Sequence, residues 1–226
     1  MFGIKILVKG DYACFTRPEM KVERVSYDVP TPSAMRGLIE SIYWKPGIQW
    51  IIDKIHVINP INFINIRRNE VKSKLSYRDV KRQMEDDTVD ISIYRGGDNI
   101  NQRASLILKD VVYGLEAHFE MTGAEGSDAD KHYAIATRRI KNGQYVKVPV
   151  LGCREFPASV EWVEGFPESR IKGRIDLGYM LYDMKFNESN NVKQYSDCAT
   201  PIWYRPIMED GIIDVKKYFE ETGVNK

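Results

Sequence analysis

Apolar and polar residues alternate in two segments of the chain. Residues 2–9 (FGIKILVK) alternate apolar and polar, which predicts a half-buried strand. Residues 106–121 (LILKDVVYGLEAHFEM) show the same pattern from Val111 onward and predict a second strand or strand pair. The polar face of this segment carries His118. We expect its imidazole to point to water, a partner or a substrate, although a surface histidine in a cross-strand pair would fit the same pattern.

A helix is predicted for residues 32–43, where apolar residues follow a spacing of three and four positions. Thr31 can cap this helix, and Pro32 suits its first position. Pro46 should end the helix, because the proline ring disfavours helical geometry in the residue before it.

Tyr43 ends this helix at the border of the apolar stripe. Arg36 lies seven residues earlier, so the two side chains nearly superimpose along the helix. We expect the Tyr43 hydroxyl to stay near solvent, next to Arg36 and close to Lys45. The alternative is a tyrosine that merely anchors the helix.

Residues 130–142 (DKHYAIATRRIKN) predict a second helix, which Gly143 ends. Arg138 and Arg139 give this helix a basic C-terminal end. These cations fit either RNA binding or simple compensation of the helix dipole. His132, near the start of the helix, is expected to be solvated.

Between these elements the sequence predicts a strand over residues 54–66, interrupted at Asn59-Pro60. The polar residues 67–103 predict a long hairpin or a flexible excursion, a kind of segment that is often functional or mobile. A last strand is expected within residues 145–156 (YVKVPVLGCREF), running into a turn.

The predicted order is strand, helix, strand, strand, helix, strand. This order is typical of an α+β fold of the ferredoxin-like, or RNA-recognition-motif-like, type with decorated loops. The short apolar patches after this unit predict a small β-rich C-terminal domain. We therefore expect an RNA-binding and catalytic domain over residues 1–158 and a second domain over residues 159–226.

Bulk properties narrow the class of protein. The chain has 226 residues, ordinary hydrophobic and charged contents, no apolar run long enough for a membrane span and no secretory signal. Its three cysteines are odd in number, far apart in sequence and in no CxxC pattern. These features indicate a cytoplasmic protein without a disulfide framework or a zinc site.

Positive charge is concentrated in the first third of the chain. Residues 1–82 hold 15 Lys and Arg against 8 Asp and Glu, although the whole chain has a net charge of only +1. Such an asymmetry points to nucleic acid or a charged membrane, unless the charges simply mix on the folded surface. The candidate RNA-binding residues are Arg17, Lys21, Arg24, Arg36, Arg67, Arg68, Arg138 and Arg139.

Common cofactor and metal motifs are missing from the sequence. There is no GxGxxG before a suitable helix, no P-loop and no HExxH. The three histidines are too dispersed in sequence to suggest a metal site. We expect no cofactor, and any nuclease activity should be independent of metal ions. A tyrosine, an imidazole and a basic surface are the groups that such a ribonuclease needs.

Several sequence blocks carry a family resemblance. In order along the chain they are GDYACFTRPE, SYDVPTPSAMRGLIESIYWKP, LKDVVYGLEAHFE, KHYAIATRRIKNGQ and VLGCREFPA. Together they resemble the fifth CRISPR-associated protein family in its type I-C (Dvulg) subtype. The resemblance covers residues 3–160 and continues through IDLGYMLYDM.

The resemblance implies a protein of the RAMP superfamily that cuts precursor CRISPR RNA at the base of each repeat hairpin. Such proteins stay bound to the 5′ handle of the guide RNA and join the backbone and large subunits of the type I-C interference complex. The proposed catalytic residues of the family are a tyrosine, a histidine and a lysine, and the first two match Tyr43 and His118. At the lysine position this chain has Glu116 and Ala117, so Lys45 or Lys109 would have to substitute.

Cleavage without a metal would proceed by attack of a ribose 2′-OH on the adjacent phosphate, giving a 2′,3′-cyclic phosphate and a 5′-OH. Tyr43 and His118 would share the acid and base roles, and they would border one positively charged groove. The alternative is a non-catalytic scaffold subunit that only grips the 5′ handle. A weaker alternative is an unrelated binding module of the same shape.

Overall fold

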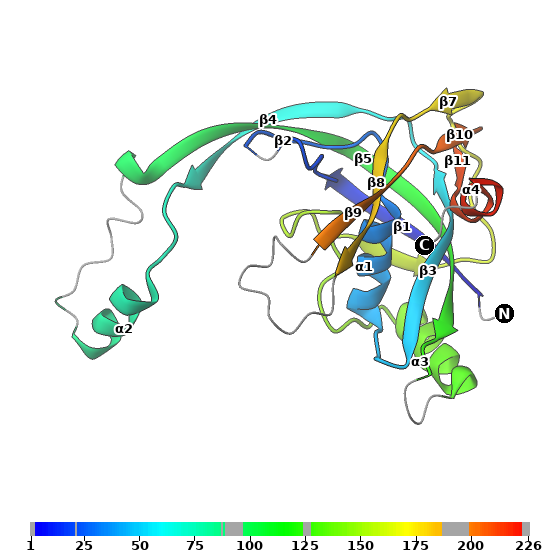
Figure 1. The fold of residues 1–226 in the computed structure, drawn as a ribbon, viewed down its shortest axis with the longest axis horizontal. Coiled ribbons are helices and arrows are strands. Elements are labelled where there is room, and N and C mark those ends of the chain that lie inside the picture. The colour runs from blue at the N-terminus through cyan, green and yellow to red at the C-terminus, as the bar shows by residue number, and fades with distance from the viewer. Residues whose placement is uncertain are drawn as a thin grey trace.

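Most strands of the chain belong to one large, mainly antiparallel sheet with helices packed around it (Figure 1). This computed structural model describes residues 3–20, 22–86, 88, 97–123, 128–186 and 199–222. The helices are α1 (Pro32–Ile42), α2 (Tyr77–Glu85), α3 (Ala129–Lys141), α4 (Val215–Thr222) and the short 3₁₀ helix η2 (Gly97–Asn99). The strands are β1 (Gly3–Ala13), β2 (Arg24–Val25), β3 (Ile48–Val57), β4 (Phe63–Val71), β5 (Ile100–Met121), β6 (Ser159–Trp162), β7 (Arg174–Asp176), β8 (Met180–Phe186), β9 (Ala199–Tyr204), β10 (Ile207–Glu209) and β11 (Ile212–Asp214).

The centre of the sheet has the strand order β6-β1-β5-β3, and all of these neighbours are antiparallel. Ile6 of β1 lies opposite Leu115 of β5, so the apolar faces of the two strands coincide. The strands predicted at 2–9 and 106–121 are thereby confirmed, the first from Gly3 onward because residue 2 lies outside the described residues. The predicted interruption at Asn59-Pro60 is also confirmed, because this dipeptide lies between β3 and β4.

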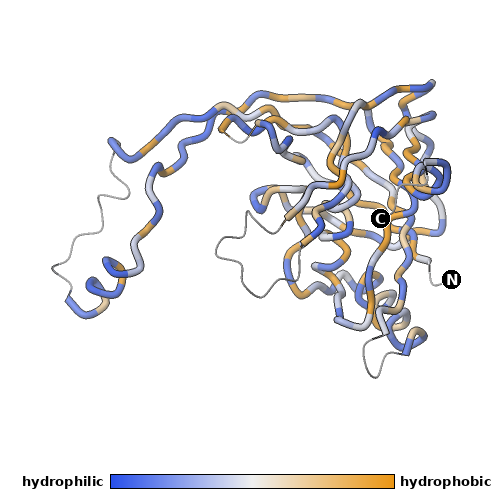
Figure 2. The backbone as a smooth tube through the Cα atoms, viewed as in Figure 1, coloured by the Kyte–Doolittle hydropathy of each residue, from blue (hydrophilic) through white to orange (hydrophobic). Residues whose placement is uncertain are grey.

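Helices α1 and α3 cover the apolar face of this sheet. Helix α1 packs against β3, α3 packs against β6, and the two helices contact each other. Figure 2 shows hydrophobic residues concentrated in these packed segments, whereas α2 is largely hydrophilic. The residues that α1 and α3 bury are Pro32, Met35, Leu38, Ile39, Ile42, Ala136 and Ile140.

The predicted helix ends are largely confirmed. The Thr31 hydroxyl accepts a hydrogen bond from the backbone N–H of Ala34 at 3.2 Å, and Pro32 occupies the first turn of α1. Gly143 follows α3 with φ of +61°, a left-handed conformation that a glycine adopts without strain.

A hairpin arm extends from the body of the protein and arches to one side (Figure 1). Its strands are β4 and the first part of β5, which pair from Phe63↔Leu108 to Val71↔Ile100. Helix α2 lies beyond the paired strands, in the connection between them, and buries none of its residues. The long hairpin predicted within residues 67–103 is confirmed where the chain is described; residues 87 and 89–96 lie outside the described residues.

The strand expected within residues 145–156 is wrong. The backbone N–H groups of Val146 and Lys147 both donate to the carbonyl of Ser41 at the end of α1. These two N–H groups therefore bond to the end of a helix instead of to a neighbouring strand. The strand that completes the central sheet is β6, further along the chain.

The C-terminal part is rich in strands, as expected. β11, β10 and β7 continue the large sheet beyond β3, and β8 and β9 pair as a separate two-stranded sheet. A boundary between residues 158 and 159 stays a prediction, but β6 follows it immediately and pairs with β1. In the described ranges, no helix is long and apolar enough to cross a membrane.

Candidate active site

Tyr43 lies inside the protein, between the end of α1 and α3. Its side chain is buried, with 2% of the residue exposed, and its hydroxyl is 2.7 Å from Nδ1 of His132. The indole Nε1 of Trp50 donates to the Tyr43 carbonyl at 2.9 Å, and the Arg139 guanidinium lies 5.3 Å from the phenol ring. Burial raises the pKa of Tyr43, and the charge of Arg139 opposes that rise. The expected solvent position of this hydroxyl is therefore wrong.

Arg36, which was expected beside Tyr43, makes its contacts elsewhere. Arg36 forms a two-pronged ion pair with Asp183 of β8, with Nη2 2.8 Å from Oδ1, and also pairs with Glu40. It therefore joins α1 to β8 instead of flanking the phenol. Lys45 is exposed beyond the end of α1. The cation that does contact Tyr43 is Arg139, which also donates to the carbonyl of Ile42 at 2.9 Å.

His118 is also buried, with 5% of the residue exposed. Its Nδ1 lies 2.8 Å from Oδ2 of Asp53, and its Nε2 lies 3.8 Å from Oε1 of Glu120. The carboxylate comes from the neighbouring strand β3, so His118 forms the cross-strand pair that the alternation also allowed, but in a buried position instead of on the surface. Glu120 is exposed, so the Nε2 edge of the ring faces the side where solvent begins.

The structure does not bring Tyr43 and His118 into one groove. Phe119 packs edge-on against Trp50 at 5.3 Å and against His132 at 6.4 Å, which places Phe119 on the same face of the sheet as Tyr43. Successive residues of a strand point to opposite faces, so His118 lies on the other face. The sheet separates the phenol from the imidazole.

All three histidines of the chain are paired with an oxygen. The Nε2 atom of His56 lies 2.9 Å from Oε1 of Glu116, and the ring of His56 packs 4.4 Å from that of Phe166. His132 was expected to be solvated and instead binds Tyr43. No pattern in the sequence pairs His132 with Tyr43, because 89 positions separate them and the contact exists only once α1 and α3 pack together.

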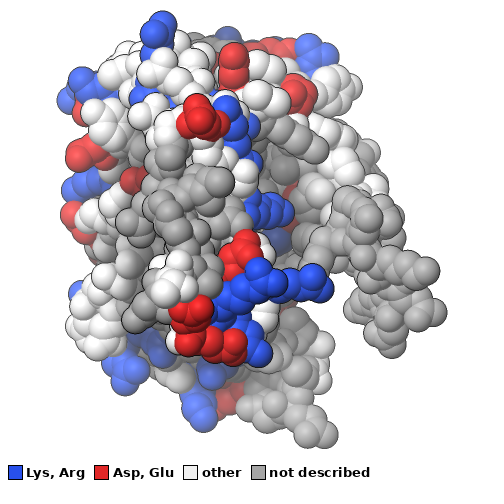
Figure 3. Space-filling view, turned by 90° about the vertical axis from the view of Figure 1, so that its left-hand side faces the viewer, with Lys and Arg blue, Asp and Glu red and all other residues white. Residues whose placement is uncertain are grey.

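Four of the seven candidate RNA-binding residues that the structure describes contact carboxylates, Arg36 among them. Arg17 pairs with Asp28, Arg24 with Glu70 and Glu155, and Arg68 also with Glu155. Figure 3 accordingly shows Lys and Arg intermixed with Asp and Glu over the face that it presents. Arg67 and Arg138 are exposed, and Lys21 lies outside the described residues.

A thiol pair was missed by the sequence analysis. Cys14 at the end of β1 and Cys153 both contact the hydroxyl of Thr16, at 3.5 Å and 4.0 Å. A hydrogen bond from Cys14 lowers the pKa of Cys153 to about 6, although burial opposes this. Both cysteines are free, and Cys198 lies outside the described residues. The two thiols are 139 positions apart, so only the docking of the Cys153 turn on Cys14 reveals the pair.

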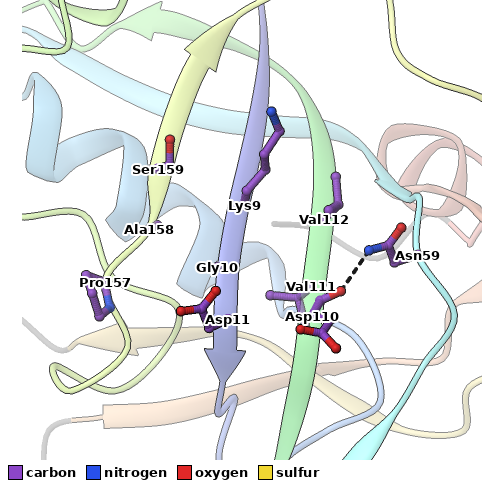
Figure 4. A pocket seen from close by; sticks show the side chains of 10 residues that line it. All are labelled: Lys9, Gly10, Asp11, Asn59, Asp110, Val111, Val112, Pro157, Ala158 and Ser159. Atoms are coloured by element: carbon purple, nitrogen blue, oxygen red, sulfur yellow. Dashed lines mark hydrogen bonds between the residues drawn. The ribbon is translucent and has the colours of Figure 1, made fainter.

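A pocket of about 540 Å³ lies on the body between β1, β5 and the approach to β6 (Figure 4). Asp11 and Asp110 lie on its two neighbouring strands, and the amide of Asn59 donates to the carbonyl of Asp110 at 2.8 Å. None of its described lining residues is a predicted catalytic residue. Elsewhere in the described ranges, no three or more His, Cys, Asp or Glu residues are placed to hold a metal ion.

Solved structures similar to this chain share its fold. One, titled "Crystal Structure of CRISPR-associated Protein", has a TM-score of 0.65 and 24% identity, with 96% of this chain and 93% of that chain covered. A second, a functionally uncharacterized protein SMU1763c from Streptococcus mutans, has a TM-score of 0.63 and 24% identity, with 93% and 90% covered.

Curated relatives are closer in sequence. A protein of Mannheimia succiniciproducens named "CRISPR pre-crRNA endoribonuclease Cas5d" is 43% identical, with 96% of each chain covered. A protein of Thermus thermophilus with the same name is 40% identical, with 97% of this chain and 95% of that protein covered. The family model Cas_Cas5d, described as "CRISPR-associated protein (Cas_Cas5)", matches residues 3–216. The chain therefore belongs to the Cas5d family of CRISPR-associated proteins.

Proposed function

We propose that this chain is an endoribonuclease that processes precursor CRISPR RNA. The observation that carries the proposal is the identity of 43% and 40%, over nearly full length, to two proteins named for that activity. Cleavage falls at the base of the repeat hairpin, and the protein keeps the 5′ handle of the guide as a subunit of the type I-C complex. Its protein partners there are the backbone and large subunits.

The fold supports RNA binding by a ferredoxin-like, RNA-recognition-motif-like unit. In that proposal β1, α1, β3, β5, α3 and β6 form its strand–helix–strand–strand–helix–strand order. The strand order β6-β1-β5-β3 fits this plan. The unit comprises the RNA-binding domain proposed for residues 1–158 together with β6, which follows that boundary; the β-rich remainder forms the second domain. Arg67 and Arg138 are exposed and are the candidates best placed to meet phosphates.

The proposed chemistry is metal-independent. The ribose 2′-oxygen attacks the adjacent phosphorus, the bond to the 5′-oxygen breaks, and the products carry a 2′,3′-cyclic phosphate and a 5′-OH. A base must take the 2′-OH proton, and an acid must protonate the leaving oxygen. We propose that the imidazole of His118 takes one of these two proton-transfer roles. Its Nδ1 atom is held by a carboxylate, and its Nε2 edge faces the exposed Glu120.

For Tyr43 and Lys45 we propose roles other than proton transfer. The Tyr43 hydroxyl is committed to His132 on the other face of the sheet, so its contribution is to hold the junction of α1 and α3. Lys45 is exposed next to this junction and suits contact with a phosphate. Tyr43→Phe tests the hydroxyl alone, because it keeps the ring, and unchanged cutting removes the hydroxyl from the mechanism.

The decisive experiment incubates the purified protein with labelled repeat RNA in EDTA. A single cut at the stem base supports the nuclease, and His118→Ala should then abolish cutting while RNA binding persists. An RNA that is bound but intact would support the scaffold alternative, whose motivation is the absence of a lysine beside His118. Equal loss of cutting and binding in His118→Ala would make this histidine a binding or folding residue.

A further inference from the structure

A β-bulge in β3 sets the position of Asp53. Opposite β5, Ile52 pairs with Ala117 and Lys54 pairs with Glu116, so Asp53 is an extra residue between two consecutive pairs. An extra residue is left out of the ladder, and the strand bends locally, which re-aims its side chain. Here the carboxylate is turned toward His118, whose own partner across the ladder is Ile51.

The contact fixes the tautomer of the imidazole. A carboxylate oxygen can only accept a hydrogen bond, so the Nδ1 atom of His118 must carry the hydrogen in the 2.8 Å contact with Asp53 Oδ2. In the neutral ring, Nε2 then holds the lone pair. Nε2 is 3.8 Å from Glu120 Oε1, which is longer than a hydrogen bond, so this carboxylate does not occupy it.

The carboxylate of Asp53 is held at an energetic cost. The side chain is 19% exposed, and its Oδ1 atom is buried without a hydrogen-bond partner among the described residues. An unsatisfied buried polar atom costs about 1–3 kcal/mol. A side chain selected only for stability would not leave this oxygen unpaired, whereas a carboxylate that must orient an imidazole accepts the cost.

We propose that Asp53 is the positioning residue of His118 in RNA cleavage, and that the β3 bulge exists to place it. The proposal rests on the nuclease function proposed above. Asp53 keeps Nδ1 protonated, so that Nε2 receives the 2′-OH proton as the 2′-oxygen bonds to phosphorus. The bond from phosphorus to the 5′-oxygen breaks, and that oxygen takes a proton from water. The imidazolium then returns its proton to solvent.

The same strand face offers a matched control. Two positions before His118 on β5, Glu116 pairs with His56 at 2.9 Å, almost the same distance as in the Asp53–His118 pair. Glu116→Gln therefore makes the same carboxylate-to-amide change in a neighbouring imidazole pair. This pair packs against Phe166 and has no part in the proposed mechanism.

The test compares Asp53→Asn with Glu116→Gln on repeat RNA. The amide of Asp53→Asn can donate to Nδ1 and favour the tautomer with hydrogen on Nε2, so kcat should fall by about 10²–10⁴-fold, with KM within about threefold. Glu116→Gln should leave both constants within about threefold. A kcat of Asp53→Asn equal to that of the control would overturn the proposal.

Nitrogen-15 NMR of the wild-type protein provides a second readout that does not depend on a variant folding. At a pH at which the ring is neutral, the spectrum should show the hydrogen of His118 on Nδ1, and Asp53→Asn should move it to Nε2. Hydrogen on Nε2 in the wild type would overturn the proposal even if Asp53→Asn does not fold. Wild-type protein that leaves repeat RNA intact would instead remove the nuclease function, whereas cutting by the wild type and Asp53→Asn alike would remove only the role of Asp53.

Discussion

Gly152 provides the sharpest stability test, because its position excludes any side chain. Its φ is +85°, in the left-handed region, and an added Cβ atom would lie 2.0 Å from the carbonyl oxygen of Cys14. Contacts of this kind ordinarily lie at 3.4–4 Å, so the turn and β1 would have to separate. That separation would break the hydrogen bond from the Cys14 N–H to the Leu151 carbonyl, now 3.0 Å long.

Two contributions determine the expected loss of stability in Gly152→Ala: the left-handed backbone conformation and the broken hydrogen bond. The left-handed conformation costs an alanine about 1–2 kcal/mol, and a buried N–H left without its partner costs about 1–3 kcal/mol. The free energy of unfolding should therefore fall by about 2–5 kcal/mol. In a chain of this length each kcal/mol lowers Tm by about 2–4 °C.

A matched control separates the conformational cost from the cost of the lost hydrogen bond. Gly173 has φ of +86°, but nothing lies within 4 Å of an added Cβ atom. Gly173→Ala should cost only the conformational term, about 1–2 kcal/mol. Urea unfolding followed by circular dichroism measures both variants. Equal losses in the two variants would show that the close approach of Gly152 to Cys14 does not exist in solution.

Two further predictions concern the Cys14–Cys153 and Arg36–Asp183 contacts. Iodoacetamide should alkylate Cys153 at a rate that rises through about pH 6, because the thiolate reacts and its pKa is lowered by Cys14, and Cys14→Ala should shift this rise to higher pH, as read by mass spectrometry. Arg36→Lys should lower the free energy of unfolding by about 1–2 kcal/mol, because an ammonium cannot make the two-pronged contact with Asp183, and an unchanged urea midpoint would show that this pair adds nothing.

The sequence predicted the elements whose pattern is long enough to be periodic. The alternation in β1 and β5, the cap at Thr31 and the stop at Gly143 all appear where they were expected. Three-residue strands such as β10 and β11 are too short to show a period, so the continuation of the sheet beyond β3 was not foreseen.

The site was predicted less well, for physical reasons. Tyr43 and His118 were singled out as candidate catalytic residues from the sequence. Their hydrogen-bond partners, however, depend on packing that no local pattern encodes. His132 reaches Tyr43 only through the contact of α1 with α3, and Asp53 reaches His118 only through the bulge. His132 satisfies a hydroxyl that was expected near solvent, and Asp53 satisfies an imidazole that was expected to meet water, a partner or a substrate.

Strand β5 runs from the arm into the body of the protein. Measured along its curved path, its 22 residues are about 70 Å long at the usual rise of 3.3 Å per residue. One end is clamped between β1 and β3, and the other end carries the arm. The direction in which the arm extends is therefore decided at the clamp. A small tilt of β5 between β1 and β3 moves the far end of the arm by a distance that grows with the length of the strand.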